Sequence, residues 1–163
     1  MALLEGYARL IDALLLELRA EYGDRLMAVA VFGSVGRGTP RADSDLDFLF
    51  VARDLPPGRF ARVEEFLPVE ERLAPLLRVV TDGPPVMLSP VFKSPDELEQ
   101  GSPLFLDMVE DARVVYDPEG LLTTRLDRLR ARLRQLGARR IWQGNAWYWE
   151  LKPDLKPGEI IVL

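Results

Sequence analysis

The 163-residue sequence contains neither cysteine nor histidine. Without cysteine there are no disulfides and no thiolate metal sites, and without histidine there are no Ser-His-Asp triads and none of the usual zinc sites. Carboxylates are therefore the side chains that remain to bind a metal ion.

Long apolar runs are also missing from the sequence. No run approaches the roughly 18 to 20 residues that cross a bilayer, and charged residues interrupt the N-terminal leucines at Glu5, Arg9, Asp12 and Glu17, unlike a signal peptide. We therefore expect a cytoplasmic protein with no membrane association. The formal net charge of −5 argues against broad binding to nucleic acid, which requires a basic face.

The length and the 48% hydrophobic content are enough for one buried core and too little for two. Residue spacing predicts helices over 2–22, 59–79 (broken by Pro68) and 95–109, and strands over 26–32, 85–92 and 112–116. We expect residues 1–120 to form the core of the domain. Residues 121–163 should add a C-terminal helix and an aromatic-rich tail that pack on this domain or extend it.

A glycine-containing turn follows the first predicted strand. The apolar run 26–32 ends at Gly33, and Gly33 and Gly36 allow the main chain to approach a ligand closely. Backbone N–H groups here, together with the Ser34 hydroxyl, can surround phosphate oxygens. A short helix starting at Ser34 would add its positive N-terminal end. The turn therefore predicts a phosphate site.

Two aspartates mark the start of the next strand. Alternation from Asp45 onwards places Asp45 and Asp47 on one face of the strand, with Phe48 and Phe50 on the other. Two such carboxylates can share one Mg²⁺ ion, which water and substrate phosphates then complete. The alternative is purely structural, with the glycines forming a tight connection and residues 43–45 serving as turn or cap residues.

The combination Gly33-Ser34, ten intervening residues and Asp45-Leu46-Asp47 resembles the signature of the nucleotidyltransferase superfamily related to DNA polymerase β. It looks most similar to the minimal nucleotidyltransferases. Arg37-Gly38 and Ser44 also resemble the usual residues of this loop, and the order of helices and strands resembles the family as far as about residue 118. The resemblance implies an α+β fold in which helices pack mainly on one face of a mixed, twisted sheet.

The resemblance also implies an activity, namely Mg²⁺-dependent transfer of NMP from an NTP, with ATP as first choice, onto a hydroxyl group. Gly33 and Ser34 would bind the β- and γ-phosphates with the help of Arg37, while Asp45 and Asp47 bind one or two metal ions. Ser44 is expected to belong to the nucleotide site. Family members modify small molecules, nucleic-acid ends or protein tyrosines, and small members often modify a helical partner protein, so such a protein is the first candidate acceptor.

The sequence departs from the family at the third carboxylate, which catalytic members usually carry on a later strand beside the aspartate pair. The corresponding run 85–92 contains no acid, and Ser89 is its only hydroxyl. Three alternatives stay open. A flanking acid folds back into the site, two carboxylates suffice for slow transfer, or the domain is a nucleotide-binding module that acts by holding a partner. The nearest acids are Asp82, Asp96, Glu97 and Glu99.

The tail beyond residue 120 has its own composition. Residues 124–136 combine arginines with leucines at helical spacing, and Trp142, Trp147 and Trp149 fall within eight residues. The arginines suit either a solvated surface or an acidic partner, and the tryptophans suit either packing or base stacking. The apolar end at 160–163 would cover a sheet edge or pair with another subunit, which would form a homo-oligomer.

Overall fold

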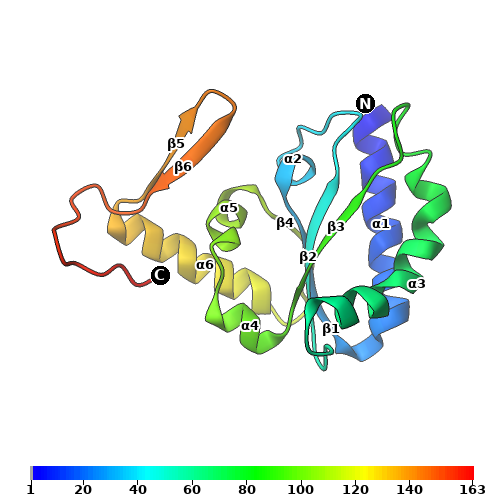
Figure 1. Cartoon of the computed structure of the whole chain (residues 1–163), viewed down its shortest axis with the longest axis horizontal. Helices are drawn as coiled ribbons and strands as arrows, with labels where there is room; N and C mark the ends of the chain where they lie inside the picture. Colours follow the sequence, from blue (N-terminus) through cyan, green and yellow to red (C-terminus); the bar gives the residue numbers. More distant parts are fainter. Residues whose placement is uncertain (1) are drawn as a thin grey trace.

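A four-stranded mixed sheet forms the centre of the molecule (Figure 1). The structure is a computed structural model that describes residues 2–163. Strand β1 pairs antiparallel with β2 and β4, whereas β2 pairs parallel with β3. The sheet order is β3-β2-β1-β4, with bounds Leu26–Val31 (β1), Leu46–Ala52 (β2), Leu88–Lys93 (β3) and Arg113–Tyr116 (β4). The mixed, twisted sheet of the predicted α+β fold is confirmed.

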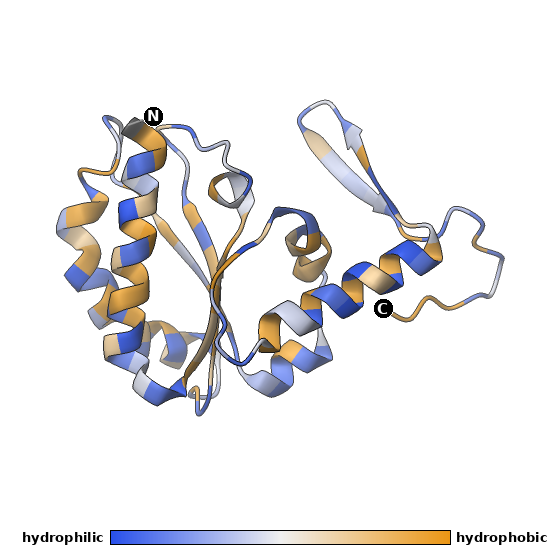
Figure 2. Ribbon diagram, turned by 180° about the vertical axis from the view of Figure 1, so that it is seen from behind, coloured by the Kyte–Doolittle hydropathy of each residue, from blue (hydrophilic) through white to orange (hydrophobic). Residues whose placement is uncertain are grey.

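Helices pack on both faces of this sheet. The two longest, α1 (Ala2–Tyr22) and α3 (Arg59–Leu77), cover one face, while α4 (Pro95–Gln100), α5 (Leu104–Asp111) and α6 (Leu121–Leu136) cover the other (Figure 1). We expected helices mainly on one face of the sheet, whereas the structure has three helices on the second face as well. Hydrophobic and hydrophilic residues alternate along α1 and α6 (Figure 2), so each helix has an apolar side to bury.

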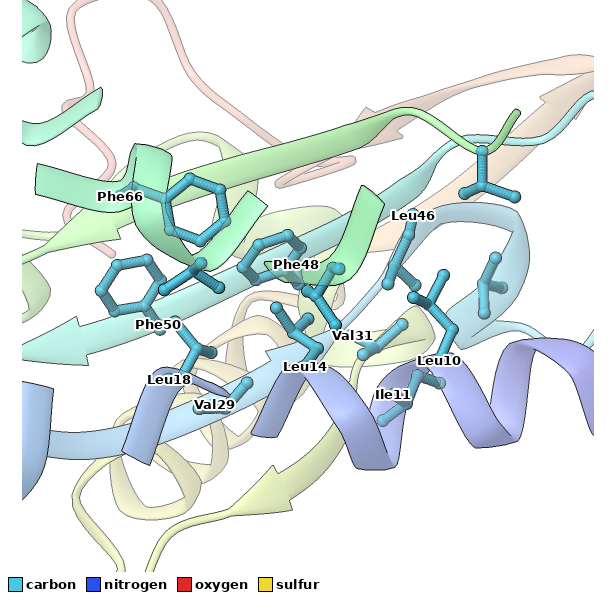
Figure 3. Close-up of a cluster of buried hydrophobic side chains, with 14 of the residues drawn as sticks. Leu10, Ile11, Leu14, Leu18, Val29, Val31, Leu46, Phe48, Phe50 and Phe66 are labelled. Atoms are coloured by element: carbon cyan, nitrogen blue, oxygen red, sulfur yellow. The ribbon is translucent and has the colours of Figure 1, made fainter. Parts of the chain in front are cut away.

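The alternation of β2 divides the core into two clusters. Phe48 and Phe50 point toward α1 and α3, where the Phe48 and Phe66 ring centroids lie 5.9 Å apart (Figure 3). Leu49 and Val51 point the other way and pack with α5 and α6. Because a shift of one residue would exchange these faces, the two clusters fix the register of β2 and hence the direction of every side chain along it.

Two of the predicted helices differ from expectation. Helix α3 continues through Pro68 and Pro75, although proline removes a backbone hydrogen bond. Its buried residues Phe66, Val69, Leu73 and Leu77 belong to the first core cluster, and this packing outweighs the loss. The helix predicted over 95–109 is instead two helices, because the chain turns at Gly101, where φ is +83°.

The tail forms a helix followed by a β-hairpin. Strands β5 (Arg139–Gln143) and β6 (Ala146–Glu150) pair antiparallel beyond the end of α6 (Figure 1). The sequence analysis did not predict this hairpin. The apolar residues 160–163, predicted to cover a sheet edge or to pair with another subunit, form neither helix nor strand. A 3₁₀ turn (Gly23–Arg25) and the one-turn helix α2 (Gly33–Gly36) complete the elements. Within residues 2–163, no helix has the length and apolar character to cross a membrane.

Helix α4 begins with a capping box. The Ser94 hydroxyl accepts a hydrogen bond from Glu97 N at 3.2 Å, and Ser94 N donates to Glu97 Oε2 at 2.9 Å. The same carboxylate accepts two hydrogen bonds from the Arg62 guanidinium, at 2.8 and 3.0 Å. The hydrogen bond from Arg62 lowers the pKa of Glu97, with the backbone N–H of Ser94 adding to this effect. Glu97 therefore serves the structure of α4.

Replacing Glu97 with glutamine should reduce the free energy of unfolding by about 1 kcal/mol at pH 7, because the ion pair with Arg62 is lost. A carboxyl whose pKa is lowered by folding stabilises the fold above its unfolded pKa and loses this effect as the pH falls. The deficit should therefore shrink by pH 3 in urea unfolding experiments. Glu99→Gln, on the same helix and exposed, is the control. An equal deficit at both pH values would contradict the assignment.

Candidate active site

The predicted phosphate turn is joined directly to the aspartate strand. Phe32 N donates to the carbonyl of Asp47 at 3.0 Å, which carries the β1–β2 pairing up to the turn. Helix α2 then begins at Gly33, one residue earlier than predicted, and Thr39 N donates to the Ser34 carbonyl at 2.9 Å. The turn and the start of β2 are thus one connected unit.

Gly33 lies against the carboxylate of Asp47. A Cβ atom at Gly33 would be 2.3 Å from Asp47 Oδ2, and the φ angle of +65° is one that side chains with a Cβ rarely adopt. Only glycine fits both conditions. The phosphate-binding turn and the metal-binding carboxylate, predicted from separate parts of the sequence, therefore meet at one place.

Neither Asp45 nor Asp47 has a side-chain partner in the part of the chain that the structure describes. Asp45 is exposed just before β2, and Asp47 is half-buried within it, on the face that also carries Leu49 and Val51. Over residues 2–163, no side-chain hydrogen bond or ion pair engages either carboxylate. Burial raises the pKa of Asp47, the charge of Asp45 adds to this rise, and Arg37 opposes it. A bound cation would relieve both unfavourable effects.

These residues suit Mg²⁺, which prefers one or two carboxylates and completes its shell with water and phosphate oxygens. Asp45 and Asp47 would hold the ion. No group of three or more candidate metal-binding side chains occurs in the described part of the chain. Oxygens from water and a bound phosphate would therefore have to supply the remaining ligands.

Serine occupies the strand position beside Asp47. In the parallel pairing of β2 with β3, Asp47 is opposite Ser89, so the two side chains share a face of the sheet. The acids that flank β3 in the sequence do not form a three-carboxylate group with Asp45 and Asp47 in residues 2–163. Of these acids, Glu97 is bound to Arg62. The alternative in which a flanking acid folds back is thus not what the structure shows.

Ser44 has a local role in the loop before β2. Its hydroxyl accepts a hydrogen bond from Arg41 N at 2.9 Å. Its carbonyl accepts a bond of 2.6 Å from the hydroxyl of Tyr7, a buried residue of α1. Tyr7 lies on the buried face of α1, and nothing in its sequence spacing indicates where its hydroxyl bonds. Tyr7 ties α1 to the loop that presents Asp45.

Arg37 is held by a residue that the sequence analysis missed. Its Nη1 lies 2.9 Å from Asp111 Oδ2, at the end of α5. The other oxygen of Asp111 binds Arg140 Nη1 of the tail hairpin, also at 2.9 Å. Arg37 nevertheless remains close enough to Asp47 to lower its pKa. The structure thus places Arg37 at the site and links it to the tail.

Comparison with known proteins identifies the family. Residues 11–113 match the model of the nucleotidyltransferase domain, which is more than half of the chain. The chain therefore belongs to the nucleotidyltransferase family, as its sequence motif predicted, and is a transferase. A curated relative named as a putative protein adenylyltransferase, from Methanocaldococcus jannaschii, is 26% identical over 129 residues, covering 78% of this chain and 83% of that protein.

Solved structures with similar folds include nucleotidyltransferases from other organisms. A tri-AMPylated HEPN toxin in complex with MNT antitoxin, from Shewanella oneidensis, contains a chain with 15% identity and a TM-score of 0.42, covering 84% of this chain and 93% of that one. A putative nucleotidyltransferase from Sulfolobus solfataricus has 18% identity and a TM-score of 0.44, covering 73% and 90%.

Gly33→Ala should weaken binding of a non-hydrolysable ATP analogue with Mg²⁺ by about tenfold or more, because the new methyl group displaces the Asp47 carboxylate. The matched control is Gly38→Ala. Gly38 has a similar φ of +75° but open space around its Cβ position. Both variants should lose about 1 kcal/mol of stability from the strained backbone, whereas only Gly33→Ala should lose affinity in calorimetric titration. Equal affinity in the two variants would contradict the contact.

Proposed function

We propose that this protein is a Mg²⁺-dependent nucleotidyltransferase that transfers AMP from ATP to a hydroxyl group and releases pyrophosphate. The observation that carries the proposal is the contact between the Gly33 backbone and the Asp47 carboxylate. Metal bridging of phosphates requires that phosphate-binding and metal-binding groups share one site. Family membership supports the same class of reaction.

The residues divide the work as follows. Gly33 and Ser34 would bind the β- and γ-phosphates, Arg37 would neutralise part of their charge, and Asp45 and Asp47 would hold the metal ion. Bound Mg²⁺ supplies charge neutralisation at the phosphates during transfer. The acceptor oxygen bonds to the α-phosphorus as the bond to the bridging α–β oxygen breaks. Pyrophosphate departs, and the acceptor proton passes to water.

The proposed acceptor is a hydroxyl on a partner protein. The name of the curated relative, a protein adenylyltransferase, supports this acceptor class. The chain carries a net charge of −5, which disfavours nucleic acid as the acceptor. A protein side chain is therefore preferred over a nucleic-acid end, with a helical partner as the first candidate.

The metal–nucleotide site predicts that Asp45→Asn combined with Asp47→Asn abolishes Mg²⁺-dependent binding of a non-hydrolysable ATP analogue. The wild-type protein should bind the analogue more tightly with Mg²⁺ than in EDTA, because two carboxylates near phosphates repel them without a cation. Titration calorimetry measures both. Asp43→Asn, an exposed carboxylate that pairs with Arg41 at 3.6 Å, is the control and should bind like the wild type. Unchanged binding in the double variant would sink the assignment.

A second candidate function is a nucleotide-binding module that acts by holding a partner. The pairing of Asp47 with Ser89 favours it, because a serine stands beside the aspartate where a carboxylate general base could act. Such a module would bind the nucleotide without detectable transfer. Both candidate functions include nucleotide binding, and only the enzyme transfers AMP from the nucleotide.

Ser89→Asp should separate them. An acid placed beside Asp47 should speed the conversion of ATP to AMP and pyrophosphate, with water as the acceptor, by about tenfold or more. Ser89→Asn, of similar shape but without charge, should not. If the wild type and Ser89→Asp both bind the ATP analogue and neither forms AMP, the binding module is the better description.

A further inference from the structure

A buried carboxylate joins the nucleotide loop to the tail. Asp111 is 5% exposed, and its two oxygens bind Nη1 of Arg37 and Nη1 of Arg140, each at 2.9 Å. The side chains of Arg37 and Arg140 are 27% and 17% exposed, so both are accessible in part. Residues far apart in the chain thus form one cluster around Asp111.

The hairpin is fixed in the position that brings Arg140 to this cluster. The indole nitrogens of Trp147 and Trp149 both donate to Asp107 Oδ1 on α5, at 2.7 and 3.3 Å. The Trp147 ring also lies beneath both guanidinium groups, with its centroid 5.1 Å from Cζ of Arg37 and 5.3 Å from Cζ of Arg140. Cation–π contact and ion pairing together hold the two arginines side by side.

The cluster has unused capacity for an anion. Two guanidinium groups share one carboxylate, which leaves a net charge of +1 at this point of an acidic protein. Each guanidinium has five N–H donors, and only one nitrogen of each binds Asp111. The remaining donors of Arg37 and Arg140 have no hydrogen-bond acceptor within residues 2–163. Paired guanidinium groups with free donors are well suited to phosphate oxygens.

We propose that Arg140, supplied by the β5–β6 hairpin, is a phosphate-binding residue of the nucleotide site, held beside Arg37 by Asp111. The inference rests on the proposed function in one respect, namely that the phosphates bound are those of the nucleotide. Asp111 is a positioning residue, since its oxygens contact the two arginines. The tail would then complete the site that the core begins.

The test uses inorganic tripolyphosphate as the probe, in EDTA, with the whole chain. Arg140→Met should weaken tripolyphosphate binding by about tenfold or more in titration calorimetry, whereas Arg139→Met should bind like the wild type. Arg139 is the neighbouring exposed arginine and pairs with Glu150 in the hairpin. Arg140→Lys keeps the positive charge but lacks the planar guanidinium fork, so it should bind more tightly than Arg140→Met and more weakly than the wild type.

Tryptophan fluorescence shows whether the hairpin keeps its place, because all three tryptophans lie in it. Should the spectrum of Arg140→Met change, Asp107→Asn is the comparison, since it weakens the hydrogen bonds that hold Trp147 and Trp149 while the Arg140 side chain itself is retained. A larger loss of affinity in Arg140→Met than in Asp107→Asn supports the proposal, and equal losses overturn it. Wild-type affinity in Arg140→Met, or no tripolyphosphate binding by the wild type, also overturns it.

The outcome is separable from that of the proposed function. Tripolyphosphate binding in EDTA requires neither metal nor nucleotide, whereas the enzyme proposal stands on Mg²⁺-dependent nucleotide binding that needs Asp45 and Asp47. Binding of tripolyphosphate through Arg140 without Mg²⁺-dependent nucleotide binding would retain the anion site and reject the enzyme. The reverse result would reject only the role of Arg140.

Discussion

The register of β2 is the constraint on which the site depends. This strand lies between β1 and β3 and is packed on both faces, with Phe48 and Phe50 in one cluster and Leu49 and Val51 in the other. A slip of one residue would place the Asp47 carboxylate among aromatic rings, where burying an unpaired charge is costly. The hydrophobic effect therefore orients the Asp47 carboxylate, which makes no hydrogen bond or ion pair of its own within residues 2–163.

The turn at Gly33 depends on this register in the same way. The bond from Phe32 N to the Asp47 carbonyl closes the ladder at the point where β1 ends. Asp47 Oδ2 then fills the space that a side chain at residue 33 would need. Short-range patterns encode all of this, since strand alternation and glycine spacing are local. For that reason the sequence alone predicted the strand and its two faces, whereas the family resemblance implied that the turn and the carboxylates share one site.

Features set by distant contacts were not predictable in this way. The rule that proline ends a helix predicted a break in α3 at Pro68. The helix continues instead, because its buried residues pack in the first core cluster. The hairpin has a local signal in the turn residues Gly144-Asn145, which lie between two runs with aromatic residues, but its position on the molecule depends on a distant contact. Trp147 finds Asp107, forty residues away. Asp111 was not predicted because its partners are distant in the sequence, namely Arg37, which follows α2, and Arg140 in the tail. Its one local signal is its place on the buried side of α5.

The charges of the site are sorted into two groups with opposite signs. Asp45 and Asp47 are acidic and lack partners in the described chain, while Arg37 and Arg140 around Asp111 are basic in sum. Under the proposed function, a metal–triphosphate complex satisfies both groups at once, with the cation on the aspartates and the phosphates on the arginines. The cation alone would leave the arginines without an anion, and the triphosphate alone would leave the aspartates without a cation. Because the carboxylates repel phosphate when no cation is present, metal and triphosphate each increase the affinity for the other, as binding linkage requires. In an acidic protein, this sorting of charge is what makes a site for a polyanion physically reasonable.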